Sequence, residues 1–513
     1  MKSRMFAAID VGSNEVVMKI FNITTQSIER VDEIRYSLDL GSDTYTTGKI
    51  KQERVDELCR VLKNFSGIMD SYHVKDYRIC ATSAIRETEN THVLLDLIEQ
   101  RTGMKIEVLS NSEQRFLDYK SVASRGDVFN RIIEKGTAIV DIGGGSIQLS
   151  LFDKDSLIAT QNMRIGVLRI REMLYKLNVS ESKYPELIEE IVGGQLEVFK
   201  KLYLKDREIE NIIIVDDYLS ASINCITSGQ ELPGCMEISA YGLFLQELIT
   251  MSRREIIRSY NMPEEHTLLL IIAALLVKQI VQMMQAENIW APGVTICDGM
   301  AYEYAEKSKI FSTGHDFEQD IIACAKNISK RYMGSRKRSE TLEQIALTIF
   351  DSMKKVHGLG KRERLLLRLA TLLHDCGKYI SLNNLGNCGY DIIMSTEIIG
   401  LSHREREIVA NVVRYNHMEL ASYDYIGKVT TLAPKSYLII AKLTAILRVA
   451  NGLDRSHKQK FKDVTASYDK DKLIITICSN TDITLEQGLF REKAELFEEV
   501  FSVRPVIRQK RKI

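Results

Sequence analysis

The hydrophobic pattern of the first 125 residues changes repeatedly between short apolar runs and stretches with helical periodicity. The apolar runs predict a β-hairpin and further strands at residues 6–21, 33–40, 77–81 and 105–109. The helical periodicity predicts helices over residues 52–72 and from Ser83 onward. Because alternating strands and helices are typical of an α/β fold, we expect one α/β lobe over residues 1–125.

A second α/β lobe is expected over residues 126–305. Its predicted strands lie at residues 137–141, 148–152 and 211–215, and the last of them is rich in Ile. The most apolar run of the chain, residues 268–277, is about half as long as a segment that spans a bilayer. We therefore expect a buried helix there.

From residue 306 the strands disappear, and helical periodicity dominates as far as residue 460. The clearest helices are predicted over residues 341–355, 361–374, 402–414 and 437–451. A strand at residues 472–478 and a helix at residues 489–501 are predicted after them. We expect an all-helical domain over residues 306–460 and a small α+β cap over residues 461–513.

The composition is that of an ordinary soluble globular protein, with 45% hydrophobic and 27% charged residues in a chain of 513. Lys plus Arg and Asp plus Glu both number 69, so no overall charge attracts the protein to nucleic acid or to a membrane. The nine cysteines are scattered and form no CxxC pair. This favours reduced thiols and a cytoplasmic location.

Two segments with the same pattern lie within the predicted hairpins of the two lobes. In each, an apolar strand ends in an aspartate, Asp10 or Asp141, and a turn of small residues follows. The turns are Gly12-Ser13-Asn14 and Gly143-Gly144-Gly145-Ser146. Small side chains let consecutive N–H groups face an anion, and a carboxylate can hold a hydrated divalent cation. The repeated pattern predicts a phosphate-binding clamp made by two lobes.

Four short motifs follow one another through the first lobe and into the second. They are Ala8-Ile9-Asp10-Val11-Gly12-Ser13-Asn14, Ala81-Thr82-Ser83-Ala84-Ile85-Arg86, Leu109-Ser110-Asn111-Ser112-Glu113 and Asp141-Ile142-Gly143-Gly144-Gly145-Ser146. The helical part then contains Leu373-His374-Asp375-Cys376-Gly377-Lys378. With these motifs the chain resembles the exopolyphosphatase and guanosine pentaphosphate phosphohydrolase family over nearly its whole length. The resemblance implies two actin-like (ribonuclease H-like) lobes, then an all-helical HD-like domain and a small α+β cap.

The resemblance also implies a hydrolase that releases orthophosphate from inorganic polyphosphate or from guanosine pentaphosphate. Glu113 matches the position of the catalytic base, while Arg86 and the two turns would bind phosphate. Asp10 and Asp141 would hold a Mg²⁺ or Mn²⁺ ion that assists the attack of water. No GxxxxGK[ST] motif is present, so a P-loop enzyme is disfavoured. The family further implies a homodimer.

Two of these residues have a purely structural alternative. Glu113 completes a Ser110-x-x-Glu113 pattern, which is the signature of a capping box at a helix start. Arg86 stands next to Glu87 and is able to form a surface ion pair with it. The order of the four motifs favours the functional interpretation of both residues.

Three positions depart from the family pattern. Glu15 stands where the family has Ser or Thr, and Ile147-Gln148 replace the usual Thr-Glu. Asp216-Asp217 occupy the place of a further Gly-rich turn. Added negative charge repels a polyanion, and the missing carboxylate removes a group that helps to position metal or water. The departures leave open a second function, a sensor that binds a phosphorylated nucleotide or polyphosphate with little turnover.

In the helical part, His374, Asp375 and the distant Asp454 match part of an HD-type metal site. The position of the first His is occupied by Arg338, and a guanidinium has no lone pair for a metal. We expect a degenerate site, with His417 as a possible replacement ligand. Two alternatives remain open here: hydrolysis in the HD-like domain, or buried residues in a domain that shapes the substrate channel or the dimer interface.

Overall fold

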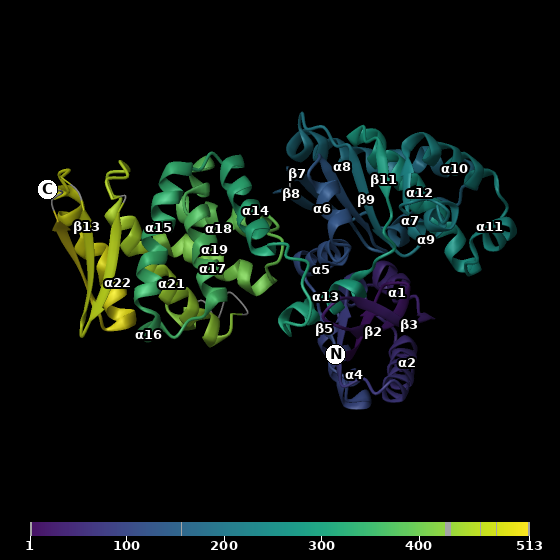
Figure 1. Ribbon diagram of the computed structural model, residues 1–513, viewed down its shortest axis with the longest axis horizontal. Helices are drawn as coiled ribbons and strands as arrows, with labels where there is room; N and C mark the ends of the chain where they lie inside the picture. Colours follow the sequence, from purple (N-terminus) through teal and green to yellow (C-terminus); the bar gives the residue numbers. More distant parts are fainter. Residues whose placement is uncertain (1–2, 155, 426–431, 462, 479, 511–513) are drawn as a thin grey trace. The chain divides into compact units, whose positions relative to one another are not determined.

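The computed structural model describes residues 3–154, 156–425, 432–461, 463–478 and 480–510 of the protein. The chain divides into two units, Met1–Phe317 and Glu318–Ile513. Each unit is built around its own sheets and helices (Figure 1). The boundary falls later in the chain than the predicted limit at residue 305.

The first lobe is a five-stranded sheet with its helices. Across the sheet the strands are β3 (Ile28–Ser37), β2 (Glu15–Ile23), β1 (Arg4–Val11), β4 (Asp76–Ala81) and β5 (Glu107–Val108). The first three strands are antiparallel, and β4 and β5 run parallel to β1. The helices of this lobe are α1 (Leu40–Thr47), α2 (Gln52–Ser71), α3 (Ser83–Glu87) and α4 (Thr91–Thr102). The predicted α/β character of this segment is confirmed.

The second lobe repeats this topology. Its strands are β10 (Cys235–Glu237), β11 (Asn288–Trp290), β9 (Asn211–Asp216), β6 (Thr137–Ile142), β7 (Ile147–Asp153) and β8 (Ser156–Met163), in that order. Here β6, β7 and β8 are antiparallel, and β9 and β11 run parallel to β6. The order β8-β7-β6-β9-β11 therefore matches β3-β2-β1-β4-β5. The two predicted turns consequently occupy equivalent places, each between a central strand and its antiparallel neighbour.

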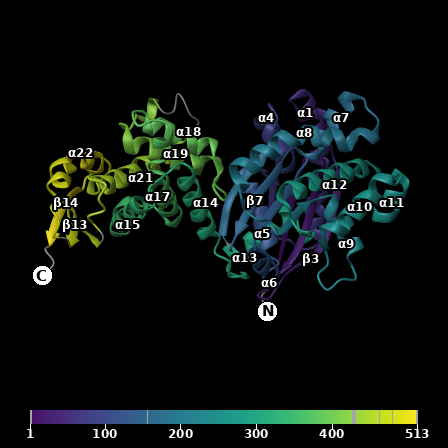
Figure 2. The ribbon, with the colours of Figure 1, turned by 90° about the horizontal axis from the view of Figure 1, so that it is seen from above.

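Helices cover one face of the second sheet. They include α7 (Val167–Leu177), α8 (Tyr184–Phe199), which continues into the π-helical turn η2 (Lys200–Leu204), and α12 (Glu264–Met284). Figure 2 shows α8 and α12 alongside the strands of this sheet. The remaining elements are α6 (Asp127–Ile133), η1 (Glu181–Lys183), α9 (Leu219–Ile226), α10 (Ile238–Thr250) and α11 (Arg253–Tyr260).

Helix α12 contains the apolar run that was predicted to be a buried helix. It is long and apolar enough to cross a bilayer, as is α21 (Pro434–Leu453) of the second unit. In the structure 72% of the most apolar window of each helix is buried inside the protein. In α12 this burial places Leu269, Ile272 and Leu276 in the core of the second lobe, which confirms the prediction.

Two helices that follow the strands in sequence pack next to the first sheet. Helix α13 (Ile296–Lys307) begins within the range predicted for the second lobe, yet Met300 and Ala301 pack against Phe6 and Ala8 of β1. Buried Lys19 of β2 donates to Asp298, the N3 residue of α13, at 2.8 Å. Helix α5 (Asn111–Ala123) packs against α13. Part of the segment assigned to the second lobe therefore belongs to the core of the first.

The second unit begins with helices and ends with a small sheet. Its helices are α14 (Phe317–Arg331, whose first residue still belongs to the first unit), α15 (Arg336–Ser352), α16 (Lys354–His357), α17 (Lys361–Leu373), η3 (Cys376–Tyr379), α18 (Leu385–Ser395), α19 (His403–His417), α21 (Pro434–Leu453) and α22 (Thr484–Phe501). Its strands are β12 (Val464–Asp469), β13 (Lys472–Cys478) and β14 (Arg504–Lys510). The four helices that were predicted most clearly are all present.

Candidate functional site

Two β-turns of the same construction carry the predicted phosphate contacts. Gly12–Glu15 connects β1 to β2, and Gly143–Ser146 connects β6 to β7. In each turn the N–H of the first residue donates to the carbonyl of the fourth residue at 3.0 Å. The internal repeat seen in the sequence is therefore a repeat of backbone geometry.

The carbonyl groups of both turns are occupied by neighbouring segments. Gly41 of α1 donates its N–H to the Ser13 carbonyl at 2.7 Å, and Leu168 of α7 donates to the Gly144 carbonyl at 2.9 Å. In the described part of the chain, the turn N–H groups of Ser13, Asn14, Gly144 and Gly145 donate to no backbone carbonyl. Successive N–H groups of this kind form a concave anion-binding surface.

The two turns approach each other across the junction of the lobes. A Cβ atom on Gly144 would lie 3.0 Å from the Cβ of Ser13, which is closer than ordinary van der Waals contact. The Ser13 hydroxyl contacts the hydroxyls of Ser83 and Tyr45 at 3.0 and 2.9 Å. Glycine at residue 144 thus permits the approach, and the two turns converge on one place.

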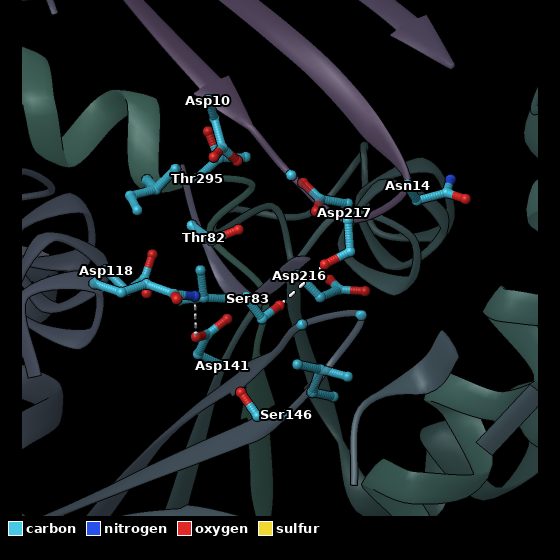
Figure 3. A pocket seen from close by; sticks show the side chains of 18 of the residues that line it. Asp10, Asn14, Thr82, Ser83, Asp118, Asp141, Ser146, Asp216, Asp217 and Thr295 are labelled. Atoms are coloured by element: carbon cyan, nitrogen blue, oxygen red, sulfur yellow. Dashed lines mark hydrogen bonds between the residues drawn. The ribbon is translucent and has the colours of Figure 1, made fainter. Parts of the chain in front are cut away.

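A cavity of about 60 Å³ lies where the turns converge. Acidic side chains line it from both lobes: Asp10, Glu15, Asp118, Asp141, Asp216 and Asp217. Figure 3 shows most of them around the cavity. Among the described residues no Lys or Arg lines it. A phosphate in this cavity therefore meets N–H donors and carboxylates together, and its charge has to be balanced by a cation.

Burial raises the pKa of the carboxyl groups around the cavity. Burial first, and then the charges of Asp217 and Glu15, raise the pKa of Asp10 well above its usual range. Burial also raises the pKa of Asp141 to about 7, although a hydrogen bond with the Asp118 carboxyl opposes this increase. The pKa of Asp118 is raised by burial and by the nearby Asp141. These groups favour their protonated forms unless a cation joins them.

Asp216 and Asp217 have different roles. The Asp216 carboxylate accepts N–H bonds from Tyr218 at 3.0 Å and from Ser220 at 2.8 Å, and so it stabilises the start of α9. Asp217 is exposed at the cavity. Of the two carboxylates that depart from the family pattern, one is taken up by a helix end and the other adds charge to the site.

Gln148 is the second departure, and it contacts the site directly. Its side chain is buried, and Nε2 donates to Asp141 Oδ2 at 2.9 Å. Its Oε1 accepts from Nε of buried Arg115 at 3.1 Å. The amide therefore holds Asp141 in a fixed orientation but has no charge to offer a metal.

Glu113, predicted as the catalytic base, completes a capping box in the structure. Its Oε2 accepts bonds from the backbone N–H and the hydroxyl of Ser110 at 3.0 and 2.7 Å, and this completes a capping box on α5. Among the described residues that line the cavity, α5 contributes Gln114 and Asp118 instead. The geometry therefore supports the capping alternative for Glu113.

Arg86, predicted to bind phosphate, is also directed to other partners. Its guanidinium donates to the Leu109 carbonyl at 2.8 Å and to Gln114 Oε1 at 3.3 Å. It does not appear among the described residues that line the cavity. Glu87, the partner in the structural alternative for Arg86, forms an ion pair with Arg169. Arg86 thus contacts the segment that leads into α5 and reaches Gln114, which lines the cavity.

The sequence interpretation missed several residues that line the cavity: Thr82, Gln114, Asp118, Tyr218 and Thr295. The sequence contained a signal for two of these residues, Gln114 and Asp118. Gln114 and Asp118 are one helical turn apart, so polar side chains at both positions share a face of α5. That face also carries buried neighbours such as Leu117 and Val122, and an aspartate among them is an unusual core residue.

Comparison with known proteins agrees with this geometry. Residues 19–308 match the model of the Ppx/GppA phosphatase family. The chain belongs to this family. Residues 322–499 match domain III of Ppx/GppA phosphatases. Members of the Ppx/GppA family hydrolyse phosphoanhydride bonds, and the protein is therefore an enzyme of this class.

Two relatives of known name are similar in sequence to this chain, one over most of its length and the other over part of it. A guanosine-5'-triphosphate,3'-diphosphate pyrophosphatase of Photobacterium profundum is 21% identical over 491 residues, covering 93% of this chain and 92% of that protein. A bifunctional 3-dehydroquinate synthase/phosphatase of Fusobacterium nucleatum is 29% identical over 210 residues, covering 38% of this chain and 31% of that protein.

Solved structures show the same fold. The Ppx/GppA family member of Aquifex aeolicus has a TM-score of 0.50 and 16% identity, and an exopolyphosphatase of Cytophaga hutchinsonii has a TM-score of 0.51 and 18% identity. Each comparison covers 61% of this chain and 100% of the other. The expected Ppx/GppA phosphatase fold is confirmed.

The helical part matches Ppx/GppA domain III, and its HD-type assignment stays a prediction. The three residues predicted for a degenerate HD site, His374, Asp375 and Asp454, are all buried in the second unit. Arg338 Nε lies 3.4 Å from Asp454 Oδ2. In the described part of the chain no three His, Cys, Asp or Glu side chains are grouped so that they could hold a metal ion.

The phosphatase cavity nevertheless suits Mg²⁺. This ion keeps several of its waters and typically binds through one or two carboxylates and substrate phosphates, without a cage of protein ligands. Asp10 Oδ1 and Asp118 Oδ2 are buried and have no hydrogen-bond partner. A hydrated cation beside Asp10 and Asp141 would satisfy such atoms and balance the acidic lining.

We expect the stability of the protein to depend on the protonation of Glu15. Burial and the charge of Asp217 raise its pKa from 4.5 to about 7, although Arg35 opposes this. Between these values the folded state holds a proton that the unfolded state has lost, so the stabilisation disappears as pH rises through 7. In the presence of a chelator, the free energy of unfolding of the wild-type protein should therefore fall by roughly 1 kcal/mol per pH unit between pH 5 and 7, relative to that of Glu15→Gln.

Thermal or urea unfolding of both proteins across this range measures the difference. Histidine titration is common to both proteins and cancels. A wild type that gains stability relative to Glu15→Gln as pH rises would show that Glu15 is ionised in the folded state.

Proposed function

We propose that this Ppx/GppA family member is a cytoplasmic, Mg²⁺-dependent phosphohydrolase that releases orthophosphate from inorganic polyphosphate or from guanosine pentaphosphate. The observation that carries the proposal is the convergence of two equivalent turns, with free N–H groups, on one acidic cavity. Both substrates expose a terminal phosphate on a phosphoanhydride. Relatives named for guanosine pentaphosphate and for polyphosphate support the substrate class.

The two turns bind the terminal phosphate in this mechanism. N–H groups of Ser13 and Asn14 approach it from one lobe, and that of Gly144 approaches it from the other. Gly145, which was also predicted to bind phosphate, is not among the described residues that line the cavity. Asp10 and Asp141 would hold Mg²⁺ or Mn²⁺, which when bound would neutralise phosphate oxygens and favour the ionised form of nearby carboxylates. Fixed donors on both sides restrict the phosphate to one orientation, as in-line attack requires.

Asp118 is the carboxyl group of α5 that faces the cavity. Its Oδ2 is buried without a hydrogen-bond partner, while its carboxyl group contacts Asp141. Gln114, one turn earlier, is an amide and cannot take a proton. We therefore assign the orientation of the attacking water to Asp118, with Gln114 holding Asp141 at 3.5 Å.

Phosphate release tests the proposal. Purified full-length protein is given medium-length polyphosphate or guanosine pentaphosphate, with Mg²⁺, with Mn²⁺, or with EDTA. We expect orthophosphate release from at least one substrate, and its loss in EDTA. No release from either substrate with either metal would contradict the proposed function.

One observation favours the second candidate, a binding protein with weak turnover. Asp141 Oδ2 already accepts from Gln148 at 2.9 Å and from Gln114 at 3.5 Å, so two amides compete with a cation for this oxygen. Calorimetric titration with the same two ligands distinguishes the functions. Tight binding without phosphate release identifies a sensor.

We further propose a homodimer, on the strength of the family resemblance alone. Light scattering coupled to gel filtration should give about twice the mass of 58.5 kDa. A mass of one chain at micromolar concentration would contradict the dimer.

A further inference from the structure

Four polar side chains from separate elements meet in the interior of the second unit. Arg338 comes from α15, His374 and Asp375 follow α17, and Asp454 follows α21. Their exposed fractions are 4%, 0%, 3% and 1%. A buried group of this kind needs internal partners, because water cannot solvate its charges.

His374 is held in the tautomer that a metal ligand requires. Its Nδ1 lies 2.8 Å from the Thr371 carbonyl, which only accepts, so Nδ1 carries the proton. Nε2 therefore has a free lone pair, and it is buried without a hydrogen-bond partner.

The two aspartates also keep free ligand atoms. Asp375 Oδ1 and Asp454 Oδ2 are buried without hydrogen-bond partners. Asp375 Oδ2 lies 3.9 Å from His374 Nε2. His417 binds the backbone of this group and not its side chains, since its Nε2 lies 2.8 Å from the His374 carbonyl. Three ligand-type side chains thus remain, and a fourth is missing.

A guanidinium stands in place of the fourth ligand. Arg338 Nε is 3.4 Å from Asp454 Oδ2, and another Arg338 nitrogen donates to Asn451 Oδ1 at 2.6 Å. The charge of Arg338 also acts on Asp375 and on His374. Lys378 Nζ lies 3.5 Å from Asp375 Oδ2, so two cations balance the two carboxylates.

We propose that Arg338 is a permanent internal cation that replaces a metal ion among His374, Asp375 and Asp454. Arg carries its charge at every physiological pH and has no lone pair, so it compensates the aspartates and at the same time excludes a metal. The second unit is consequently locked in a metal-free state. This excludes the alternative in which hydrolysis takes place in the helical domain, and it is independent of the function proposed for the first unit.

One substitution should restore the metal site. In the full-length protein, Arg338→His removes the cation and supplies a fourth ligand, giving two His and two Asp, a set that binds Co²⁺ or Zn²⁺. We expect about one more equivalent of Co²⁺ than in wild type, with visible absorption from nitrogen ligands. Arg338→His combined with His374→Asn should lose the additional equivalent.

A second measurement uses the wild-type protein and does not depend on whether an Arg338 variant folds. Wild type and His374→Asn are each dialysed against Mn²⁺, Fe²⁺ or Zn²⁺, and the metal content of the two proteins is compared. Equal metal content in the two proteins is expected. An equivalent that is present in wild type and absent from His374→Asn would overturn the proposal.

Charge compensation is tested by a double-mutant cycle. Arg338→Met leaves Asp454 without its partner and should lower the unfolding midpoint by several degrees, whereas Arg338→Met combined with Asp454→Asn should recover part of this loss. A double variant whose midpoint falls by the sum of the two single changes would show that Arg338 does not compensate Asp454.

Discussion

Replacement of Asp118 by Asn is expected to lower kcat by about 10²- to 10⁴-fold, which is the usual contribution of a positioned acid or base. Asn has nearly the same shape, so packing around this buried residue is preserved. It cannot accept a proton from the attacking water. Substrate contacts from the two turns remain, and KM should therefore change much less than kcat.

Glu113→Gln is the informative comparison, because Glu113 was the base predicted from sequence. Gln still accepts the Ser110 N–H in a capping box, so α5 should keep its start. Glu255→Gln provides a matched control, since Glu255 closes the same kind of box with Ser252 on α11. We expect kcat of both variants to stay within about threefold of the wild-type value. This change is much smaller than the loss that follows removal of a general base.

Steady-state phosphate release with a saturating divalent cation measures all three variants. If Glu113→Gln loses activity and Asp118→Asn does not, the assignment from the motif is right and the assignment from the cavity is wrong. Equal loss in Glu255→Gln would instead indicate a general effect of the cap charge.

The substitution Gly166→Ala is expected to have the second largest effect. A Cβ there would lie 2.3 Å from the Gly144 carbonyl oxygen and 2.4 Å from the Ser146 nitrogen, both backbone atoms of the second turn. The φ angle of Gly166 is −76°, which any residue adopts, so the effect is purely steric. The turn has to move away from α7, and a phosphate displaced by 1 Å costs about 10²-fold in rate.

We therefore expect kcat/KM to fall about 10²-fold and the free energy of unfolding to fall by about 1–3 kcal/mol. Gly193→Ala is the matched control, because Gly193 lies within α8 and a Cβ there meets nothing within 4 Å. It should gain about 1 kcal/mol of stability from helix propensity and keep full activity. An active and stable Gly166→Ala protein would show that the second turn is not held in place by this contact.

Regular elements with a strong period were predictable from the sequence. The buried strands β6 and β9 and the amphipathic helices α2 and α17 combine a clear pattern with sufficient length. Helix α1 was missed because its sequence, LGSDTYTT, is short and polar, and it forms because Asp39 caps it and Leu40 is buried. Strand β8 was missed because its sequence, SLIATQNM, has no clear alternation of apolar and polar residues. Its antiparallel pairing with β7 stabilises it as a strand.

The candidate site was predictable only in its contiguous parts. The two turns and their aspartates lie within a few residues of each other, so strand, turn and carboxylate can be recognised together. Asp118 comes from a helix far from the second turn in the chain, and no local pattern brings it to the same cavity. Glu113 illustrates the opposite case, since one local motif fits both a base and a cap.

What the amino-acid sequence determined by itself is the repeated strand and turn, because backbone shape in a short hairpin follows from neighbouring residues. It also predicted that Arg338 stands in place of the first His of an HD-type site, and the HD-type assignment stays a prediction. Only the tertiary structure decided which carboxylates face the cavity and which are used to cap helices. Direction and burial of a side chain depend on elements distant in the chain, and these set both the local charge and the partners that each carboxylate finds.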